Sequence, residues 1–317
     1  MFRKLFSNSK VPETILNLHI PAQILLLLFA ASSFSSCTPS ETEYIEKMYP
    51  TGQPWVVSYF HKSLISRTFN PEDKVRTEEF YIDGTPKRLV YFKEGLKEGS
   101  SSEWHEDGGR KWHGVYRADN LDSVETKWHF NGKVESLVPF QQGKEEGVAQ
   151  YWSEQGVLIT EGSFRRGKKD GTWKTYYPTR QIRSIGEFKN DIENGPWIEY
   201  YENGNKAFEG SKLNGLDEGH GTTWYENGLK SWEKHFKDGL ADSTFTWWDS
   251  TGYLKMTGTL KEGLHHGKWE EFNFWGIKMV ESNYQLGTKH GSWKEWNKYG
   301  MLTWHGIFRN DTLISSN

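Results

Sequence analysis

Short stretches of alternating polar and apolar residues run through most of the chain, and glycines separate them at a fixed interval. A tight turn of the form aromatic-x-x-Gly recurs every 24 residues, with turn glycines at Gly84, Gly108, Gly132, Gly156, Gly204, Gly228, Gly252, Gly276 and Gly300. Arg180 takes the place of glycine in the one gap of this series. The stretches between turns are roughly six to eight residues long, which suits a β-strand and is too short for a helix.

A second column lies eleven positions after each turn glycine and contains only Gly or Asp, residues that tolerate a positive φ. A third column, of Gly or Ser, follows four positions later. The spacing of these columns therefore predicts that each unit forms a β-hairpin followed by a turn into the next hairpin. A first unit at Gly52 fits if eight residues are inserted between Tyr59 and Thr77, which gives eleven units and about 22 strands. We expect an all-β fold, an elongated antiparallel meander of about eleven 24-residue β-hairpins over residues 43–317.

Aromatic residues keep the same register as the turns. The position five residues after the third column is always aromatic, at Phe80, Trp104, Trp128, Trp152, Tyr176, Tyr200, Trp224, Trp248, Phe272 and Trp296. Another column, eight residues after the turn glycine, is mostly Phe or Tyr, and a glycine often stands two residues before it, as at Gly114 and Gly162. A ring from a neighbouring strand can lie over the bare backbone of such a glycine. We therefore expect cross-strand aromatic packing to replace a second layer, with each unit stable only through its neighbours.

The first fifty residues contain no Gly and no Trp, unlike the rest of the chain. An apolar run from Ala22 to Ala31 follows a net-positive segment and precedes small residues, which is the order of a secretory signal peptide. This run is shorter than the roughly 20 residues of a membrane-spanning helix. Cys37, the only cysteine, comes next and resembles the lipidated cysteine of bacterial lipoproteins. We expect a signal peptide at 1–36, a tether at 37–42 and lipid anchoring in the cell envelope, at the outer membrane; an ordinary cleaved signal peptide is the alternative.

Composition and charge narrow the classes of function. The 18 Phe, 16 Trp, 15 Tyr and 32 Gly argue against a helical bundle or an α/β enzyme. Beyond residue 36 the chain carries 36 basic and 41 acidic residues, a net charge of −5, which offers no basic field for nucleic acid. His266 and His290 share a column that elsewhere holds carboxylates or Asn, which indicates a polar turn position and not a metal site. We find no catalytic triad or phosphate-binding loop at a usable spacing, and expect no enzyme activity, cofactor or metal.

Four stretches carry a family resemblance. Glu161–Trp173 (E-G-S-F-R-R-G-K-K-D-G-T-W) and Thr257–Trp269 (T-G-T-L-K-E-G-L-H-H-G-K-W) resemble MORN repeats. Trp197–Lys206 and Trp224–Lys230 are more similar to the MORN-variant repeats of bacterial proteins described as antitoxin-like. The resemblance extends over about residues 43–317. It implies a fold of stacked hairpins and leaves the activity open.

Three functions follow as alternatives. The first is a lipid-anchored, non-catalytic interaction or scaffolding module that docks an unknown protein partner through an aromatic strip or an exposed sheet edge. The resemblance implies the second, an antitoxin- or immunity-like protein that neutralises a partner toxin. The third is binding of glycan, peptidoglycan or lipid head groups through aromatic columns. Its candidate contacts come from adjacent aromatics that must point to opposite faces: Trp247, Trp248, Tyr177, Tyr201 and Tyr225.

Overall fold

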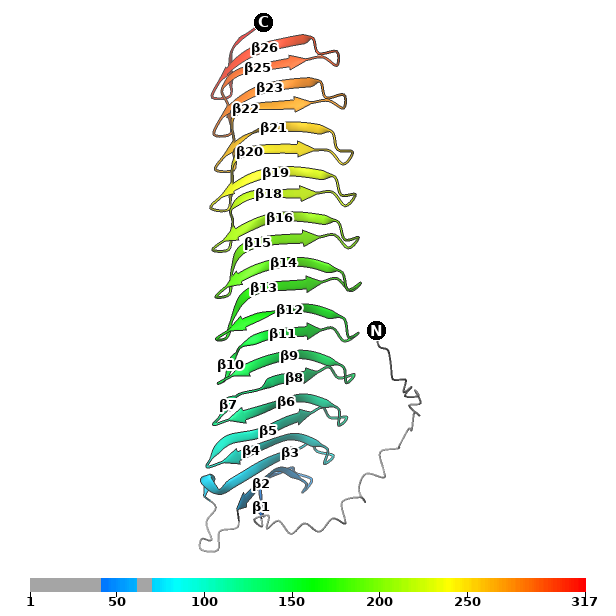
Figure 1. Cartoon of the computed structure of the whole chain (residues 1–317), viewed down its shortest axis with the longest axis vertical. Helices are drawn as coiled ribbons and strands as arrows, with labels where there is room; N and C mark the ends of the chain where they lie inside the picture. The colour runs from blue at the N-terminus through cyan, green and yellow to red at the C-terminus, as the bar shows by residue number, and fades with distance from the viewer. Residues whose placement is uncertain (1–40, 62–69) are drawn as a thin grey trace, which may run out of the picture. The chain divides into compact units, whose positions relative to one another are not determined.

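The computed structural model describes residues 41–61 and 70–317, which belong to one unit of the chain. Almost all of this unit is antiparallel β-structure in a single 27-stranded sheet, so the predicted fold class is confirmed. The strands pair in chain order as a meander, except that four two-residue strands pair only with the strand before them, and Figure 1 follows the meander from β1 to the C-terminus. No helix in this described part of the chain has the length and apolar character needed to cross a bilayer.

The elements are β1 (Glu41–Met48), β2 (Pro54–His61), the 3₁₀ helix η1 (Pro71–Asp73), β3 (Lys74–Phe80), β4 (Pro86–Lys93), β5 (Leu96–Trp104), β6 (Arg110–Arg117), β7 (Asn120–Leu121), β8 (Val124–Trp128), β9 (Val134–Gln141), β10 (Lys144–Glu145), β11 (Gly147–Trp152), β12 (Leu158–Arg165), β13 (Lys168–Tyr176), β14 (Ile182–Lys189), β15 (Ile192–Tyr200), β16 (Lys206–Leu213), β17 (Leu216–Asp217), β18 (Gly219–Trp224), β19 (Lys230–Lys237), β20 (Leu240–Trp248), β21 (Leu254–Lys261), β22 (Leu264–Phe272), β23 (Lys278–Gln285), β24 (Thr288–Lys289), β25 (Gly291–Trp296), β26 (Leu302–Arg309) and β27 (Thr312–Ser316).

The third column of the sequence pattern is a β-bulge. In the β12–β13 pair the register shifts between Gly162 and Phe164, opposite the segment that contains Gly171, whose φ is +98°. At four equivalent places the ladder is interrupted for one or two residues, which leaves the two-residue strands β7, β10, β17 and β24. These interruptions add four strands to the expected 22 or so, and β27 after the last hairpin adds another, which gives 27.

The turn columns adopt the conformation that their residue types predict. The turn glycines have a positive φ, such as +81° at Gly156, and Arg180 takes up the same left-handed conformation with φ +71°. In the second column Asp119 and Asp191 have φ values of +65° and +72°. Arg180 therefore carries backbone strain that glycine would not.

The N-terminal predictions fall largely outside the described residues. The signal peptide at 1–36 and Cys37 belong to the part of the chain that the structure does not describe, while β1 begins at Glu41, two residues before the expected start of the array. The predicted insertion lies between β2 and β3, where η1 is found, and residues 62–69 there are also outside the described part.

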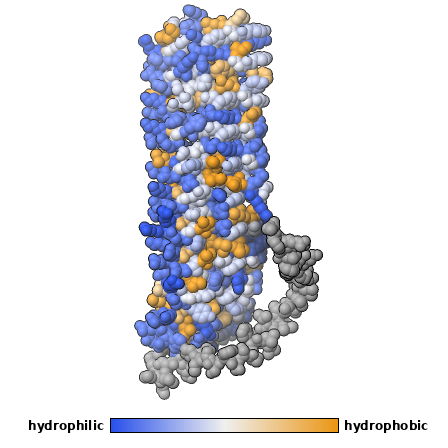
Figure 2. Space-filling view, in the orientation of Figure 1, coloured by the Kyte–Doolittle hydropathy of each residue, from blue (hydrophilic) through white to orange (hydrophobic). Residues whose placement is uncertain are grey.

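Buried side chains are spread along the sheet because the described residues form no second layer. The buried hydrophobic residues are Val56, Val57, Phe60, Val90, Val138, Ala149, Trp173 and Trp269. The face visible in Figure 2 mixes hydrophobic and hydrophilic side chains and has no continuous apolar surface. Apolar side chains must therefore be buried by residues of neighbouring strands, as in other repeat proteins whose units contact only their neighbours.

Candidate interaction surface

One row of facing residues crosses the middle of the sheet and alternates between large and small. Trp173 on β13 pairs with Gly162 on β12 and with Gly186 on β14, and Trp197 on β15 pairs with Gly186 and Gly210. The same alternation returns further on, where Trp269 pairs with Gly258 and Ser282. We call the side of the sheet to which these tryptophans point the aromatic face.

The glycines of this row provide the space that the rings occupy. A Cβ atom at Gly162 would lie 2.1 Å from the ring of Trp173, and one at Gly186 would lie 2.1 Å from the ring of Trp197. The predicted packing of rings over bare backbone is therefore confirmed in these hairpins. At Gly114, Gly210 and Gly306 the closest aromatic ring instead belongs to the residue two positions earlier on the same strand, as Trp304 does at 2.3 Å from a Cβ at Gly306.

Rings contact one another along the aromatic face. Trp173 lies edge-on to Phe164 and Phe188, with centroid distances of 5.1 and 6.2 Å. The ammonium group of Lys169 lies 4.4 Å from the Trp173 ring centroid and 5.1 Å from that of Phe188. Lys289 repeats this arrangement over Trp293 and Phe308. Cation–π and edge-to-face contacts thus join neighbouring hairpins.

The opposite side of the sheet, which we call the charged face, carries ion pairs. Lys278 Nζ lies 2.6 Å from Glu281 and 2.9 Å from Glu270, and Lys268 lies 2.8 Å from Glu270. Hydrogen bonding to these lysines holds the pKa of Glu270 and Glu281 below the ordinary value. Elsewhere on this face Tyr176 donates a hydrogen bond of 2.8 Å to Glu161, and burial together with this carboxylate raises the pKa of Tyr176 to about 12.

Tyr177, Tyr201 and Tyr225 lie in the turns along one edge of the sheet and bind backbone. Their hydroxyls donate to the carbonyl oxygens of the next unit, with distances of 2.7, 2.8 and 2.9 Å. The acceptors are the carbonyls of Tyr200, Trp224 and Trp248. These three candidate ligand residues therefore tie each turn to its neighbour.

Trp247 and Trp248 differ in environment. Trp247 is 36% exposed and pairs with Trp232 and Met256, on the aromatic face. A register shift separates it from Trp248, which is half-buried, with Lys230 Nζ 5.9 Å from its ring. Of the five candidate ligand residues, Trp247 has the ring most open to a partner.

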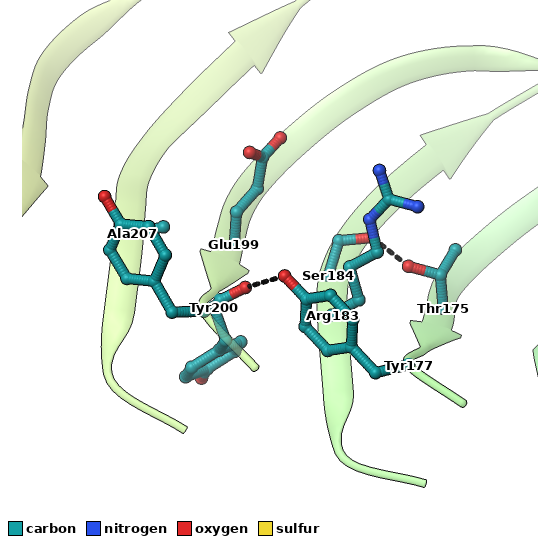
Figure 3. A pocket seen from close by; sticks show the side chains of 8 residues that line it. Thr175, Tyr177, Arg183, Ser184, Glu199, Tyr200 and Ala207 are labelled. Atoms are coloured by element: carbon teal, nitrogen blue, oxygen red, sulfur yellow. Dashed lines mark hydrogen bonds between the residues drawn. The ribbon is translucent and has the colours of Figure 1, made fainter. Parts of the chain in front are cut away.

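A groove of about 460 Å³ lies where the tyrosine edge meets the strands. Figure 3 shows Tyr177 and Tyr200 beside it, the hydrogen bond between them, and the Thr175–Ser184 contact of 2.6 Å. Arg183 also lines the groove, and its guanidinium group has no carboxylate partner among the described residues. Glu199 lines the groove as well, so the groove can accept hydroxyl-bearing groups and, at Arg183, an anionic group.

The histidines have separate partners. His265 stacks on Trp269 with a centroid distance of 3.7 Å, and burial lowers its pKa. The backbone N–H of Leu286 lies 3.4 Å from His266, while His290 lies 3.3 Å from Asn310. Within residues 41–61 and 70–317, no group of three or more His, Cys, Asp or Glu residues is placed to hold a metal ion.

One cluster of exposed aromatic residues lies in the last turns and was not predicted from the sequence. Trp275 and Tyr299 are 70% and 71% exposed, and Phe274 contacts Tyr253 with a centroid distance of 4.4 Å. The sequence feature that could have predicted this cluster is the position before the turn glycine, where Trp275 and Tyr299 replace the Asp, Asn, Gln or Thr of the other units.

Comparison with known protein structures finds distant likenesses. The crystal structure of TcdB2-TccC3 shares 10% identity over 86% of this chain and 17% of that chain, with a TM-score of 0.19. The Tc holotoxin pore of Photorhabdus luminescens shares 11% identity over 85% of this chain and 16% of that chain, with a TM-score of 0.18. This chain thus spans less than a fifth of the length of these two proteins, and no curated protein matches it.

The family comparison agrees with the hairpin pattern in the middle of the sheet. The model of the MORN repeat variant matches residues 169–190 and 193–211, which cover β13 to β16 and include both Trp173 and Trp197. Residues 169–211 of this chain carry the MORN repeat variant.

Proposed function

We propose that the chain is a non-catalytic protein-interaction module of the cell envelope. The observation that carries this proposal is a single sheet that no second layer of described residues covers, with the ring of Trp247 36% exposed on its aromatic face. Interface centres are enriched in Trp, Tyr and Phe, and rigid rings lose little conformational entropy on binding. A MORN repeat variant and a β-rich repeat fold are consistent with this role.

The pKa shifts of four titratable groups are consistent with a role without acid–base chemistry. Glu161, Glu270 and Glu281 have lowered pKa values because they accept hydrogen bonds from Tyr or Lys, so they stay ionised near neutral pH. Burial lowers the pKa of His265, which keeps that ring neutral. A general acid or base needs a pKa close to the working pH.

Anchoring through Cys37 belongs to the same proposal. A lipid on this cysteine would attach the chain four residues before β1 begins at Glu41. Mass spectrometry of the mature N-terminus tests it: an acylated Cys37 is expected, and an unmodified N-terminus at another residue would refute anchoring.

The interaction role can be tested by photo-crosslinking in cells. A photoreactive phenylalanine at Glu199, which is exposed next to Trp197 on the aromatic face, should form an adduct with a different protein. The matched control places it at Lys174, on the charged face of β13, where no such adduct is expected. Equal adducts at the two sites, or none at either, would contradict the proposal.

The groove in Figure 3 favours a second candidate, binding of a hydroxyl-rich, acidic saccharide. Tyr rings can stack on a sugar, and Arg183 can pair with its carboxylate. Binding to a glycan array that Arg183→Gln abolishes would support this candidate. Binding that survives the substitution would place the saccharide elsewhere.

A further inference from the structure

Three consecutive turns near the C-terminus form an exposed apolar patch. It consists of Tyr253, Phe274, Trp275, Tyr299 and Met301, with exposed fractions of 43%, 50%, 70%, 71% and 59%. The turns follow β20, β22 and β25, along the edge that lies at the right in Figure 1. Phe274 bridges two of the turns, because its ring contacts both Tyr253 and Trp275. We call these five residues the C-terminal turn patch.

These three turns also differ from the turns that contain Tyr177, Tyr201 and Tyr225. Where Tyr177, Tyr201 and Tyr225 reach the next unit, the patch turns have Asp249, Asn273 and Asn297. Each of these accepts hydrogen bonds from backbone N–H groups within its own turn, as Asn273 does from Trp275 and Ile277 at 2.9 and 3.0 Å. The turns are therefore fixed from inside, and their exposed rings form a pre-organised surface.

We propose that the C-terminal turn patch binds a second copy of this chain through a twofold, antiparallel contact. With roughly 200 Å² for a fully exposed large side chain, the exposed parts of the five residues amount to about 600 Å² on each copy. A self-complementary contact would then bury about 1,200 Å² in total, which is the lower limit for a specific protein–protein interface. The dimer should consequently be reversible and depend on concentration.

Charge selects the register of this contact. Successive turns along the edge are two strands apart, or roughly 10 Å, so an antiparallel copy can place the turn 297–301 opposite the turn 225–229. Lys298 then faces Glu226, and Met301 faces Leu229, which is 42% exposed. The turn 273–277 packs in the same register against the turn 249–253, so Trp275 lies near the centre, where interface energy concentrates.

The same charges disfavour a bilayer as the occupant. Lys298 is the only basic residue in the three patch turns, and the two preceding turns present Glu202 and Glu226. Segments that bind anionic membrane surfaces combine apolar residues with several Lys or Arg residues. A second copy of the chain would bury the apolar residues and would also pair Lys298 with Glu226.

Sedimentation of the full chain over a range of concentrations tests the proposal. We expect a monomer–dimer equilibrium, and Trp275→Ser should raise its dissociation constant at least about 30-fold, as loss of a central aromatic anchor does. Phe130→Ser is the matched control, because Phe130 is 67% exposed in a turn of the same edge but lies outside the patch. This control should leave the equilibrium unchanged.

A charge swap tests the register independently of folding. Lys298→Glu and Glu226→Lys should each weaken the dimer, and the double variant should recover it. A monomer at every concentration, equal effects of Trp275→Ser and Phe130→Ser, or failure of the double variant to recover would overturn the proposal. So would sedimentation with vesicles of phosphatidylglycerol that requires Trp275, since that result would assign the patch to a membrane.

Discussion

The space above Gly162 can be tested by filling it. In Gly162→Ala the new Cβ would lie 2.1 to 2.4 Å from three ring atoms of Trp173, where ordinary contacts are 3.4 Å or longer. The ring must therefore move by more than an ångström. Trp173 is only 6% exposed, packs on Phe164 and donates a hydrogen bond to the Ser163 carbonyl.

The loss of stability in Gly162→Ala can be estimated from two limits. Overpacking alone costs about 1–3 kcal/mol. Complete expulsion of a ring that buries 150–250 Å² would cost roughly 4–6 kcal/mol at about 25 cal/mol per Å². We expect about 2–4 kcal/mol for Gly162→Ala. In the Trp173→Ala background the sign should reverse, because alanine is favoured over glycine within a strand by about 0.5–1 kcal/mol.

The measurement is native-state hydrogen exchange of the β12 and β13 amides, because an array of units need not unfold in a single step. Urea unfolding followed by circular dichroism gives the global value. Gly109→Ala is the control, since a Cβ there would meet only the flexible Asp107 carboxylate, at 3.1 Å. If Gly162→Ala costs the same with and without Trp173, or costs nothing, the ring-over-glycine argument is refuted.

Three further predictions concern the turns and the charged face. Arg180→Gly should stabilise the chain by about 1 kcal/mol, by removing the strain of φ +71°, and a lower thermal midpoint would contradict this. Tyr201→Phe should cost about 1 kcal/mol, because the Trp224 carbonyl loses its 2.8 Å hydrogen bond; Tyr253→Phe, whose hydroxyl has no partner among the described residues, should cost nothing in the same urea titration. Glu281→Gln should destabilise the chain near neutral pH. The pKa of Glu281 is lowered in the folded state, so its contribution is present above the unfolded-state pKa and is lost as pH falls through the folded-state pKa. The two unfolding curves should converge in acid, and a difference that persists there would argue against the ion pairs.

The turns and the strands could be predicted from the sequence because their constraints are local. A turn that needs a positive φ admits few residue types, and the 24-residue interval repeats the constraint along the chain. Arg180 stands where the other turns have glycine, and it keeps both the 24-residue spacing and the left-handed backbone conformation. The idea that rings cover bare glycine also followed from residue types alone, and Trp173 over Gly162 bears it out.

The partners of individual side chains could not be predicted, because they depend on register. The bulge at the third column changes which residues face each other, so the ring above Gly162 comes from Trp173, a position that is not aromatic in every unit. Nothing in the pair Tyr200 and Tyr201 indicates that the second hydroxyl reaches a carbonyl 23 residues away. The C-terminal turn patch could not be predicted for another reason: its residues depart from the repeat, so the 24-residue pattern carries no information about them.

The constant register of the sheet has a consequence for how such a chain can change in length. The junction between β13 and β14 is built like the junction between β15 and β16, with a tryptophan facing a glycine in each. Removing or duplicating one 24-residue segment would therefore join surfaces that already fit, and would alter the span by two strand spacings, roughly 10 Å. The length of such a sheet can therefore change in steps of one repeat, and no step requires a new kind of contact between repeats.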